Sequence, residues 1–198
     1  MKKLLALALA IVFGCSITTR AQQMQQVVNY LQTVPDKGNW TAADLSDLRF
    51  TDVYTDEQTG ITHAYVQQQF NSIPVFNAIS AIALKNNVVV HAAPVLVDHV
   101  AAKVNATKPV LQPQDAIVAA LNHLEIATQG KPVFNRFDAG KKVYYYQWND
   151  YAQSSIEVQL VYQQSNNQLN LAYNVTIEMK NNTDWWNVRI DALKGQFL

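Results

Sequence analysis

One stretch of the sequence, from Gly60 to Ala92, constrains the fold more than any other part. It contains runs of β-branched and aromatic residues that are separated by short turn-forming segments, as in successive strands of a sheet. Asn86 and Asn87 predict a tight hairpin turn, because asparagine tolerates the positive φ angles that such turns need. With the residues just before the stretch, we expect strands over residues 50–56, 61–70, 78–84 and 88–92.

Two short helical segments are predicted ahead of this sheet. A glutamine-rich stretch over residues 22–31 has valine and leucine at helical spacing, which predicts a helix with one apolar side. Thr41 is followed three residues later by Asp44, a weakened capping box that predicts the start of a second helix. Leu45 and Leu48 would form its apolar side.

The second half of the chain predicts one helix followed by several strands. Residues 101–108 are small and polar, so we place a module boundary there. Pro113 and Asp115 suit the first turn of a helix, since proline lacks the N–H that is unpaired there and the acid interacts with the helix dipole. The apolar face of this helix contains Ala116, Ile117, Ala120, Leu121 and Leu124, and strands are expected over residues 143–148, 156–163, 169–179 and 185–191.

These patterns predict an α+β fold class. A helix followed by antiparallel strands packs against one face of the sheet, while the other face is left to solvent or to a partner. We therefore expect two small modules, each an antiparallel sheet with a helix packed on one face.

The first residues have the pattern of an export signal. Two lysines precede a ten-residue apolar run, Leu4 to Phe13, which is too short to span a bilayer. A small-x-small cleavage site ends at Ala21, so we predict a signal peptide over residues 1–21 and a secreted, extracellular protein. The alternative is a lipoprotein anchored through Cys15, which follows a glycine as in a lipobox, although the preceding phenylalanine fits that motif poorly.

Composition narrows the class of partner. Hydrophobic residues make up 49% of the chain and charged residues 15%, so a buried core is expected. Without residues 1–21 the chain has 12 basic and 15 acidic residues, a net charge of −3. This balance gives no reason to expect nucleic acid or an anionic membrane as partner. Cleavage would also remove the single cysteine, and with it any disulfide or thiolate chemistry.

The stretch that begins at Gly60 resembles the FTP motif, the fungalysin/thermolysin propeptide module that precedes the catalytic domain in secreted zinc peptidases. The matching residues are Gly60, Ile61, Thr62, His63, Tyr65, Val66, Gln67, Gln68, Ser72, Ile73, Pro74, Val75, Phe76 and Asn77. The resemblance implies an FTP-like module over residues 22–100.

The last residues, Trp185 to Leu198, resemble the closing hairpin of PepSY-type repeats. Asp191 can cap the turn through its carboxylate, and Gly195 provides the positive φ angle that the reversal needs. In propeptides of the fungalysin type, FTP and PepSY-like modules stand in this order. The resemblance therefore implies a PepSY-like module over residues 101–198.

No constellation of catalytic residues is found in the sequence. A zinc peptidase of this kind needs His-Glu-x-x-His, but none of His63, His91, His99 and His123 is followed by glutamate. We interpret His123 as a residue at a helix C-terminus and His63 as a packed sheet residue. We predict no catalytic residue and no metal ligand, so that the chain is not an enzyme; an independent hydrolase is the disfavoured alternative.

Aromatic residues cluster in the second half. Alternation along a strand places Tyr144, Tyr146 and Trp148 on one face and Tyr145 on the other. Three aromatic side chains on one face indicate a core or a protein interface more often than a carbohydrate-binding platform, which is the alternative.

The resemblances together imply the N-terminal pro-region of a secreted fungalysin-like zinc metallopeptidase. Such a pro-region binds the cognate catalytic domain, keeps the zymogen inactive and assists folding. We expect the chain as given to be a fragment without that catalytic domain, to need no cofactor (zinc belongs to the absent domain) and to have no stable membrane span. The alternative is a stand-alone secreted peptidase inhibitor or protein-binding module, acting in trans.

The candidate partner-binding residues are Gln67, Gln69, Asn71, Ile73 and Pro74. The two glutamines are polar strand residues, which we expect to face solvent or a partner. Pro74 cannot donate to a strand ladder, so we expect its segment to leave the sheet and to be available to a partner. The alternative is that Ile73 and Val75 fill the core under the turn.

Overall fold

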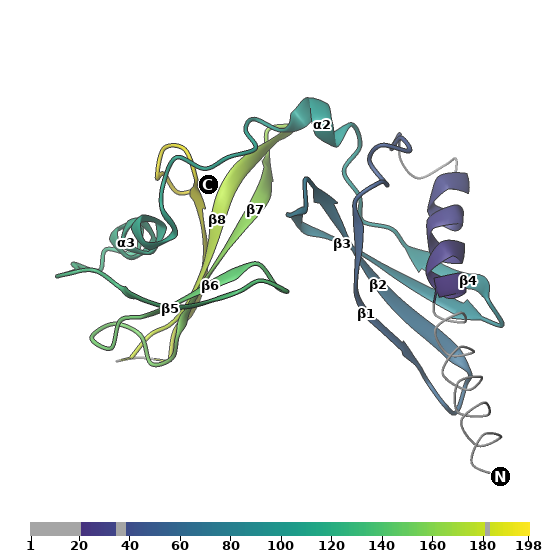
Figure 1. The fold of residues 1–198 in the computed structure, drawn as a ribbon, viewed down its shortest axis with the longest axis horizontal. Helices are drawn as coiled ribbons and strands as arrows, with labels where there is room; N and C mark the ends of the chain where they lie inside the picture. The colour runs from purple at the N-terminus through teal and green to yellow at the C-terminus, as the bar shows by residue number, and fades with distance from the viewer. Residues whose placement is uncertain (1–20, 35–38, 181–182) are drawn as a thin grey trace, which may run out of the picture. The chain divides into compact units, whose positions relative to one another are not determined.

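The structure is a computed structural model that describes residues 21–34, 39–180 and 183–198. These residues form nine strands and few helices, a mixed α and β structure dominated by strands (Figure 1). They divide into two compact units. Unit 1 contains the described residues up to Gln69 together with Asn77–His99, and unit 2 contains Phe70–Phe76 and Val100–Leu198. The predicted signal peptide, including Cys15, lies outside the described residues except for Ala21.

Unit 1 is built on the strands that the Gly60–Ala92 stretch predicts. β1 pairs antiparallel with β2, β2 lies beside β3, and β3 pairs antiparallel with β4. The predicted strands are confirmed, with bounds shifted by a few residues. They are β1 (Leu48–Thr55), β2 (Ile61–Phe70), β3 (Ile73–Lys85), whose first residues belong to unit 2, and β4 (Val88–Ala93).

Left-handed residue pairs close the tight hairpins. Asn86 and Asn87, between β3 and β4, have φ angles of 50° and 62°, which confirms the predicted turn. Asn71 and Ser72 connect β2 to β3 with φ angles of 52° and 60°. Two positive φ angles in succession match the twist of the flanking strands, so these short turns also fix the register of the pairing.

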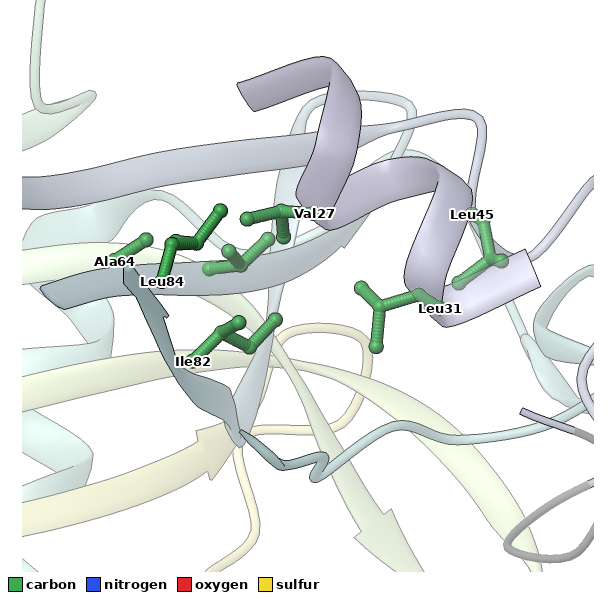
Figure 2. Close-up of a cluster of buried hydrophobic side chains, with 7 residues drawn as sticks. Val27, Leu31, Leu45, Ala64, Ile82 and Leu84 are labelled. Atoms are coloured by element: carbon green, nitrogen blue, oxygen red, sulfur yellow. The ribbon is translucent and has the colours of Figure 1, made fainter. Parts of the chain in front are cut away.

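A helix over residues 21–33 covers one face of the unit 1 sheet, as predicted. Val27 and Leu31 are fully buried on the side of the helix that faces the strands (Figure 2). Every second residue of β2 and β3 points toward them, because side chains alternate along a strand. The resulting core cluster consists of Val27, Leu31, Leu45, Ala64, Val66, Ile82 and Leu84.

The second predicted helix is wrong. Residues 42–47 form successive turns, in which the N–H of Asp44 donates to the carbonyl of Thr41 at 3.0 Å. The capping contact itself exists, since Asp44 Oδ2 accepts the N–H of Thr41 at 2.7 Å. The helix does not continue because Leu48 already pairs with Gln68 of β2. Strand pairing, which the local sequence does not reveal, ends the helical turn.

Unit 2 contains one longer helix and five antiparallel strands in the order β5-β6-β7-β8-β9. The first residues of β3 join it, since Val75 pairs in parallel with Tyr162. The predicted helix and four of the strands are confirmed. The elements are α2 (Val100–Lys103), α3 (Pro113–His123), β5 (Val133–Asp138), β6 (Val143–Gln147), β7 (Ile156–Ser165), β8 (Gln168–Glu178) and β9 (Trp185–Asp191).

The core of unit 2 is apolar and is completed by tyrosines. Of the predicted apolar face of α3, Ala116, Ile117, Ala120 and Leu121 are buried, whereas Leu124 lies just beyond the helix and is half-buried. Alternate residues of β8 from Leu169 to Ile177 are buried as well. The hydroxyl of Tyr173 donates to the carbonyl of Leu111 at 3.0 Å, and that of Tyr162 to the carbonyl of Ala106 at 3.2 Å. Burial raises the pKa of both phenols above the ordinary tyrosine value, because it disfavours the charged phenolate.

The C-terminal turn has the predicted chemistry. Asp191 Oδ1 accepts the N–H groups of Leu193 at 2.7 Å and Lys194 at 2.9 Å. Gly195 has a φ angle of 74°, the left-handed conformation that glycine adopts without steric cost. The two modules predicted over residues 22–100 and 101–198 stay a prediction. A compact unit in the structure does not by itself establish a module that folds independently.

Candidate partner-binding site in the hairpin of β2 and β3

The candidate residues lie on one hairpin, but not in one environment. Gln67 and Gln69 lie on β2 in unit 1, whereas Asn71, Ile73 and Pro74 lie in the segment Phe70–Phe76, which we call the hairpin tip and which belongs to unit 2. The hairpin therefore presents two different local settings, which are described separately below.

Gln67 does not face solvent, contrary to the sequence-based interpretation. Its exposed fraction is 9%, and Nε2 donates to the carbonyls of Gln68 at 2.9 Å and Ala78 at 3.0 Å. These bonds hold the amide against the backbone of both strands. Gln69 is half-buried, and its backbone N–H donates to the carbonyl of Asp47 at 2.9 Å. Of the two, only Gln69 offers a partly exposed side chain.

Gln68 is the residue of this hairpin that the sequence interpretation missed. It is fully buried on the helix-facing side of β2, in line with Ala64 and Val66. Its Nε2 donates to the carbonyls of Val97 at 2.8 Å and Asp44 at 3.2 Å, and Oε1 accepts the N–H of Val97 at 2.8 Å. The side chain thus connects the sheet to two segments that have no strand partner of their own.

Asp44 completes this polar network in unit 1. It is buried, and Oδ2 accepts the N–H of Thr41 at 2.7 Å, the hydroxyl of Thr41 at 2.9 Å and the N–H of His99 at 2.9 Å. His99 has a φ angle of 49°, an uncommon conformation for a residue with a side chain. The carboxylate therefore holds the last residues of unit 1 in a defined backbone conformation.

The hairpin tip stays within a sheet, so the prediction that Pro74 leaves it is wrong. β3 begins at Ile73, and Val75 is fully buried where it pairs with Tyr162. Proline is tolerated at the start of the strand because few ladder bonds are made there. The alternative prediction, that apolar tip residues fill a core, is favoured by the burial of Val75.

Further contacts hold the tip within unit 2. Phe70 meets Tyr162 edge to face with ring centroids 6.2 Å apart, and Lys142 Nζ donates to the carbonyl of Ser72 at 3.1 Å. Asn71, at the turn, is exposed. Among the candidate residues, Asn71 and the partly exposed Gln69, Ile73 and Pro74 remain accessible to a partner.

The arrangement of histidines offers no shared site. His63 stacks on Tyr54 with ring centroids 5.1 Å apart, and His123, at the end of α3, stacks on Phe197 at 3.9 Å. His99 Nδ1 lies 3.5 Å from a carboxylate oxygen of Asp98. Within residues 21–34, 39–180 and 183–198, no three His, Cys, Asp or Glu side chains gather in a way that could hold a metal ion.

The aromatic residues of β6, and Trp148 just after it, are mostly buried. Tyr146 and Trp148 are buried, and Tyr145 is buried beneath the guanidinium of Arg136, whose Cζ lies 3.6 Å from the ring centroid. The burial of these rings is consistent with the interpretation of the aromatic cluster as part of a core.

No helix of the described residues has the length and apolar character needed to cross a bilayer.

A comparison with protein families gives a match over residues 46–93, to the family model described as the Fungalysin/Thermolysin Propeptide Motif, FTP. The comparison with curated proteins gives no significant match. The matched residues include β1 to β4, the buried glutamines of β2 and the hairpin tip. The match indicates a propeptide motif of the fungalysin/thermolysin type over these residues.

Proposed function

We propose that the chain acts as the pro-region of a secreted fungalysin/thermolysin-type zinc metallopeptidase, as an intramolecular inhibitor and folding aid. The supporting observation is the FTP match over residues 46–93, which coincides with a complete folded element, the strands β1 to β4. A motif that is folded as a sheet with one helix-covered face can offer a preformed surface to a catalytic domain.

The association is one between folded proteins. A stable contact of standard size buries about 800 Å² on each partner, which a sheet face and a hairpin of this kind can supply. In cis, the covalent link raises the effective concentration of the pro-region, so that even a modest contact keeps the peptidase closed. Zinc in this proposal belongs to the catalytic domain of the peptidase.

The proposal includes a PepSY-like second module and secretion through the N-terminal signal. The supporting feature for the module is the turn at Asp191 and Gly195, whose geometry suits the closing hairpin of that repeat type. The contact residues of the proposal are Gln69, Asn71, Ile73 and Pro74, with Gln67 as support for their strand.

The test is inhibition in trans. The purified chain is titrated into separately produced fungalysin-type and thermolysin-type catalytic domains, including those of the source organism, and residual peptide hydrolysis is measured. We expect loss of activity that saturates at one chain per peptidase. Full activity of every peptidase at saturating chain would contradict the proposal.

A double variant examines the contact residues. Gln69→Ala with Asn71→Ala should weaken inhibition and leave the circular dichroism spectrum unchanged. The matched control is Gln164→Ala with Asn166→Ala, the same residue types at the same positions of the hairpin between β7 and β8. Equal inhibition by both double variants would show that Gln69 and Asn71 do not belong to the contact, and unfolding of the first would show that they serve the fold.

A further inference from the structure

Strand β5, in unit 2, is an edge strand with an unusually apolar surface. Of the described strands, β6 alone pairs with it, so one row of its backbone N–H and C=O groups has no strand partner. The exposed fractions of Val133, Phe134 and Phe137 are 67%, 53% and 45%. Proteins normally protect such edges, because an unpaired apolar edge is a template for another strand.

A bulge organises the side chains of β5. The register with β6 shifts between Phe134 and Arg136, so that Phe134 pairs with Tyr146 and Phe137 with Tyr144. Without the extra residue, the two phenylalanines would point to opposite faces, because their positions differ by an odd number. Ring centroids lie 5.6 Å apart in the first pair and 4.6 Å apart in the second. The bulge therefore creates an aromatic ladder that ends abruptly at the open edge.

The opposite face of β5 is cationic. Arg136 lies over the ring of Tyr145, which fixes the guanidinium close to the strand. Asp138 is its nearest acid, with a separation of 3.8 Å, and this carboxylate also accepts the backbone N–H of Lys141. Lys131 and Lys141 are exposed near the two ends of the strand.

The charge of this region contrasts with that of the rest of the chain. Residues 131–142 contain four basic residues and one acidic residue, whereas residues 22–130 and 143–198 together contain eight basic and fourteen acidic residues. A cationic edge selects for an acidic partner strand and against pairing with the same edge of a second copy.

The other open edges lack this combination. β4 exposes Val88 and Val90 but contains no charged residue, and β1 contains both Arg49 and Asp52. β9 exposes Trp185 and Trp186, but the last residues of the chain cover its end, where the N–H of Leu198 donates to the carbonyl of Arg189. An open depression also adjoins the start of β5 and is lined by Lys131 and Val133 together with Asp150. The paired aromatic ladder and the fixed cation occur together on β5 alone among the described edge strands.

We propose that β5 is a strand-addition site for an extended, acidic segment of a partner polypeptide. The unpaired backbone groups of β5 bond to the main chain of that segment. Its apolar side chains continue the ladder beside Phe134 and Phe137, and its carboxylates lie opposite Arg136 and near Lys131 and Lys141. This inference does not depend on the proposed peptidase role.

The test uses two synthetic peptides with the full chain. One alternates valine with glutamate and the other alternates valine with lysine, each about eight residues long, so that alternation sends apolar and charged side chains to opposite faces. Binding is followed by backbone amide NMR shifts and hydrogen exchange. We expect the glutamate peptide to bind, to shift amides of β5 and to slow their exchange, while the lysine peptide binds at least about tenfold more weakly.

Matched charge variants then locate the interaction. Lys131→Glu with Lys141→Glu should weaken binding of the glutamate peptide about tenfold and invert the preference between the peptides. The control, Lys85→Glu with Lys108→Glu, makes the same change in net charge at exposed positions outside β5 and its flanking turns, and should leave binding unchanged. The proposal is overturned if both peptides bind equally, if neither binds, or if the shifted amides lie outside β5 and its neighbours.

Discussion

The two units bury polar groups in different ways. Among the described residues, the buried polar side chains of unit 1 are Asp44, Thr62, Gln67, Gln68 and Ser80, and that of unit 2 is Asp191. In unit 1, Asp44, Gln68 and Ser80 bond to backbone outside the strands, such as the N–H of Val95, which donates to Ser80 Oγ at 2.9 Å. In unit 2 the buried side chains are mostly apolar or tyrosine, and Asp191, the last residue of β9, accepts N–H groups of the turn that follows it.

The difference teaches how a short sheet can hold irregular segments. Hydrophobic burial stabilises any compact arrangement of similar area, whereas a buried amide stabilises only the arrangement that satisfies all its bonds. Unit 1, which has a core cluster of modest size, gains a specific structure from its polar network. Unit 2 gains its stability mainly from the apolar surface area that it buries. Substitutions of the two kinds should therefore act on different units.

The largest effect is expected from an apolar truncation in unit 2. Ile177 is fully buried on β8, and Ile177→Ala removes methylene groups and leaves a cavity, at a cost of about 4 kcal/mol in the free energy of unfolding. Denaturant titration measures the change, and hydrogen exchange should show it on β7 and β8. Uniform loss of protection in both units would show that they unfold as one, against the contrast drawn above.

A polar truncation in unit 1 comes next. Gln68→Met keeps the length of the side chain and removes the acceptor and donor that Val97 uses, with an expected loss of about 3 kcal/mol because buried backbone groups lose their partners. In the variant, hydrogen exchange of the Val97 amide should accelerate, while exchange rates in unit 2 stay those of the parent. Gln69→Ala serves as the control on the same strand, and a cost equal to that of Gln68→Met would refute the network.

A smaller effect is expected for a single hydroxyl in unit 2. Tyr173→Phe removes one hydrogen bond, to the carbonyl of Leu111, at a cost of about 1 kcal/mol at neutral pH. The raised pKa of Tyr173 means that its contribution is complete below the pKa of an unfolded tyrosine, about 10, and is lost as the pH rises further. When the pH is raised from about 9 to about 11, the free energy of unfolding should therefore fall less in Tyr173→Phe than in the parent chain. Parallel loss in both proteins would contradict the burial of this phenol.

The smallest effect is expected in the turn between β1 and β2. Asp56 Oδ1 accepts the N–H groups of Gln58 and Thr59 at 2.9 Å each, and the bond to Thr59 is the main reason that its pKa lies below the ordinary value. A lowered pKa stabilises the fold above the pKa of an unfolded aspartate, about 3.9, and this stabilisation is lost as the pH falls. Asp56→Asn should lower the thermal midpoint slightly at pH 7, and this difference should shrink as the pH falls below the pKa of an unfolded aspartate. A difference that persists in acid would exclude the charge as its cause.

The contrast between the units also explains which features the sequence predicts. α3, the turn at Asn86 and the turn at Asp191 are stabilised by residues close in sequence, and each is confirmed. Strand β5 escaped prediction because its side chains are mostly exposed, so that it lacks the buried alternation of an inner strand. An edge strand such as β5 is identified by its pairing with a neighbouring strand more than by the pattern of its own residues.

The role of Gln68 could not be predicted from the local pattern. Its partners lie 24 and 29 residues away in the sequence, at Asp44 and Val97, and no spacing rule connects them. The second of three consecutive glutamines looks like a surface residue until the strand is placed against the helix. The position does hold one signal, since Gln68 continues the buried series of Ala64 and Val66 at every second residue.

The most direct test of the pro-region account is inhibition of a fungalysin-type catalytic domain by the parent chain and by Gln68→Met. The comparison is made at a denaturant concentration where hydrogen exchange shows unit 1 of the variant open and unit 2 still protected, and where the peptidase remains active. The account predicts stoichiometric inhibition by the parent chain and its loss in the variant, because the FTP motif lies in the opened region. Equal inhibition by both, or none by either, would contradict it.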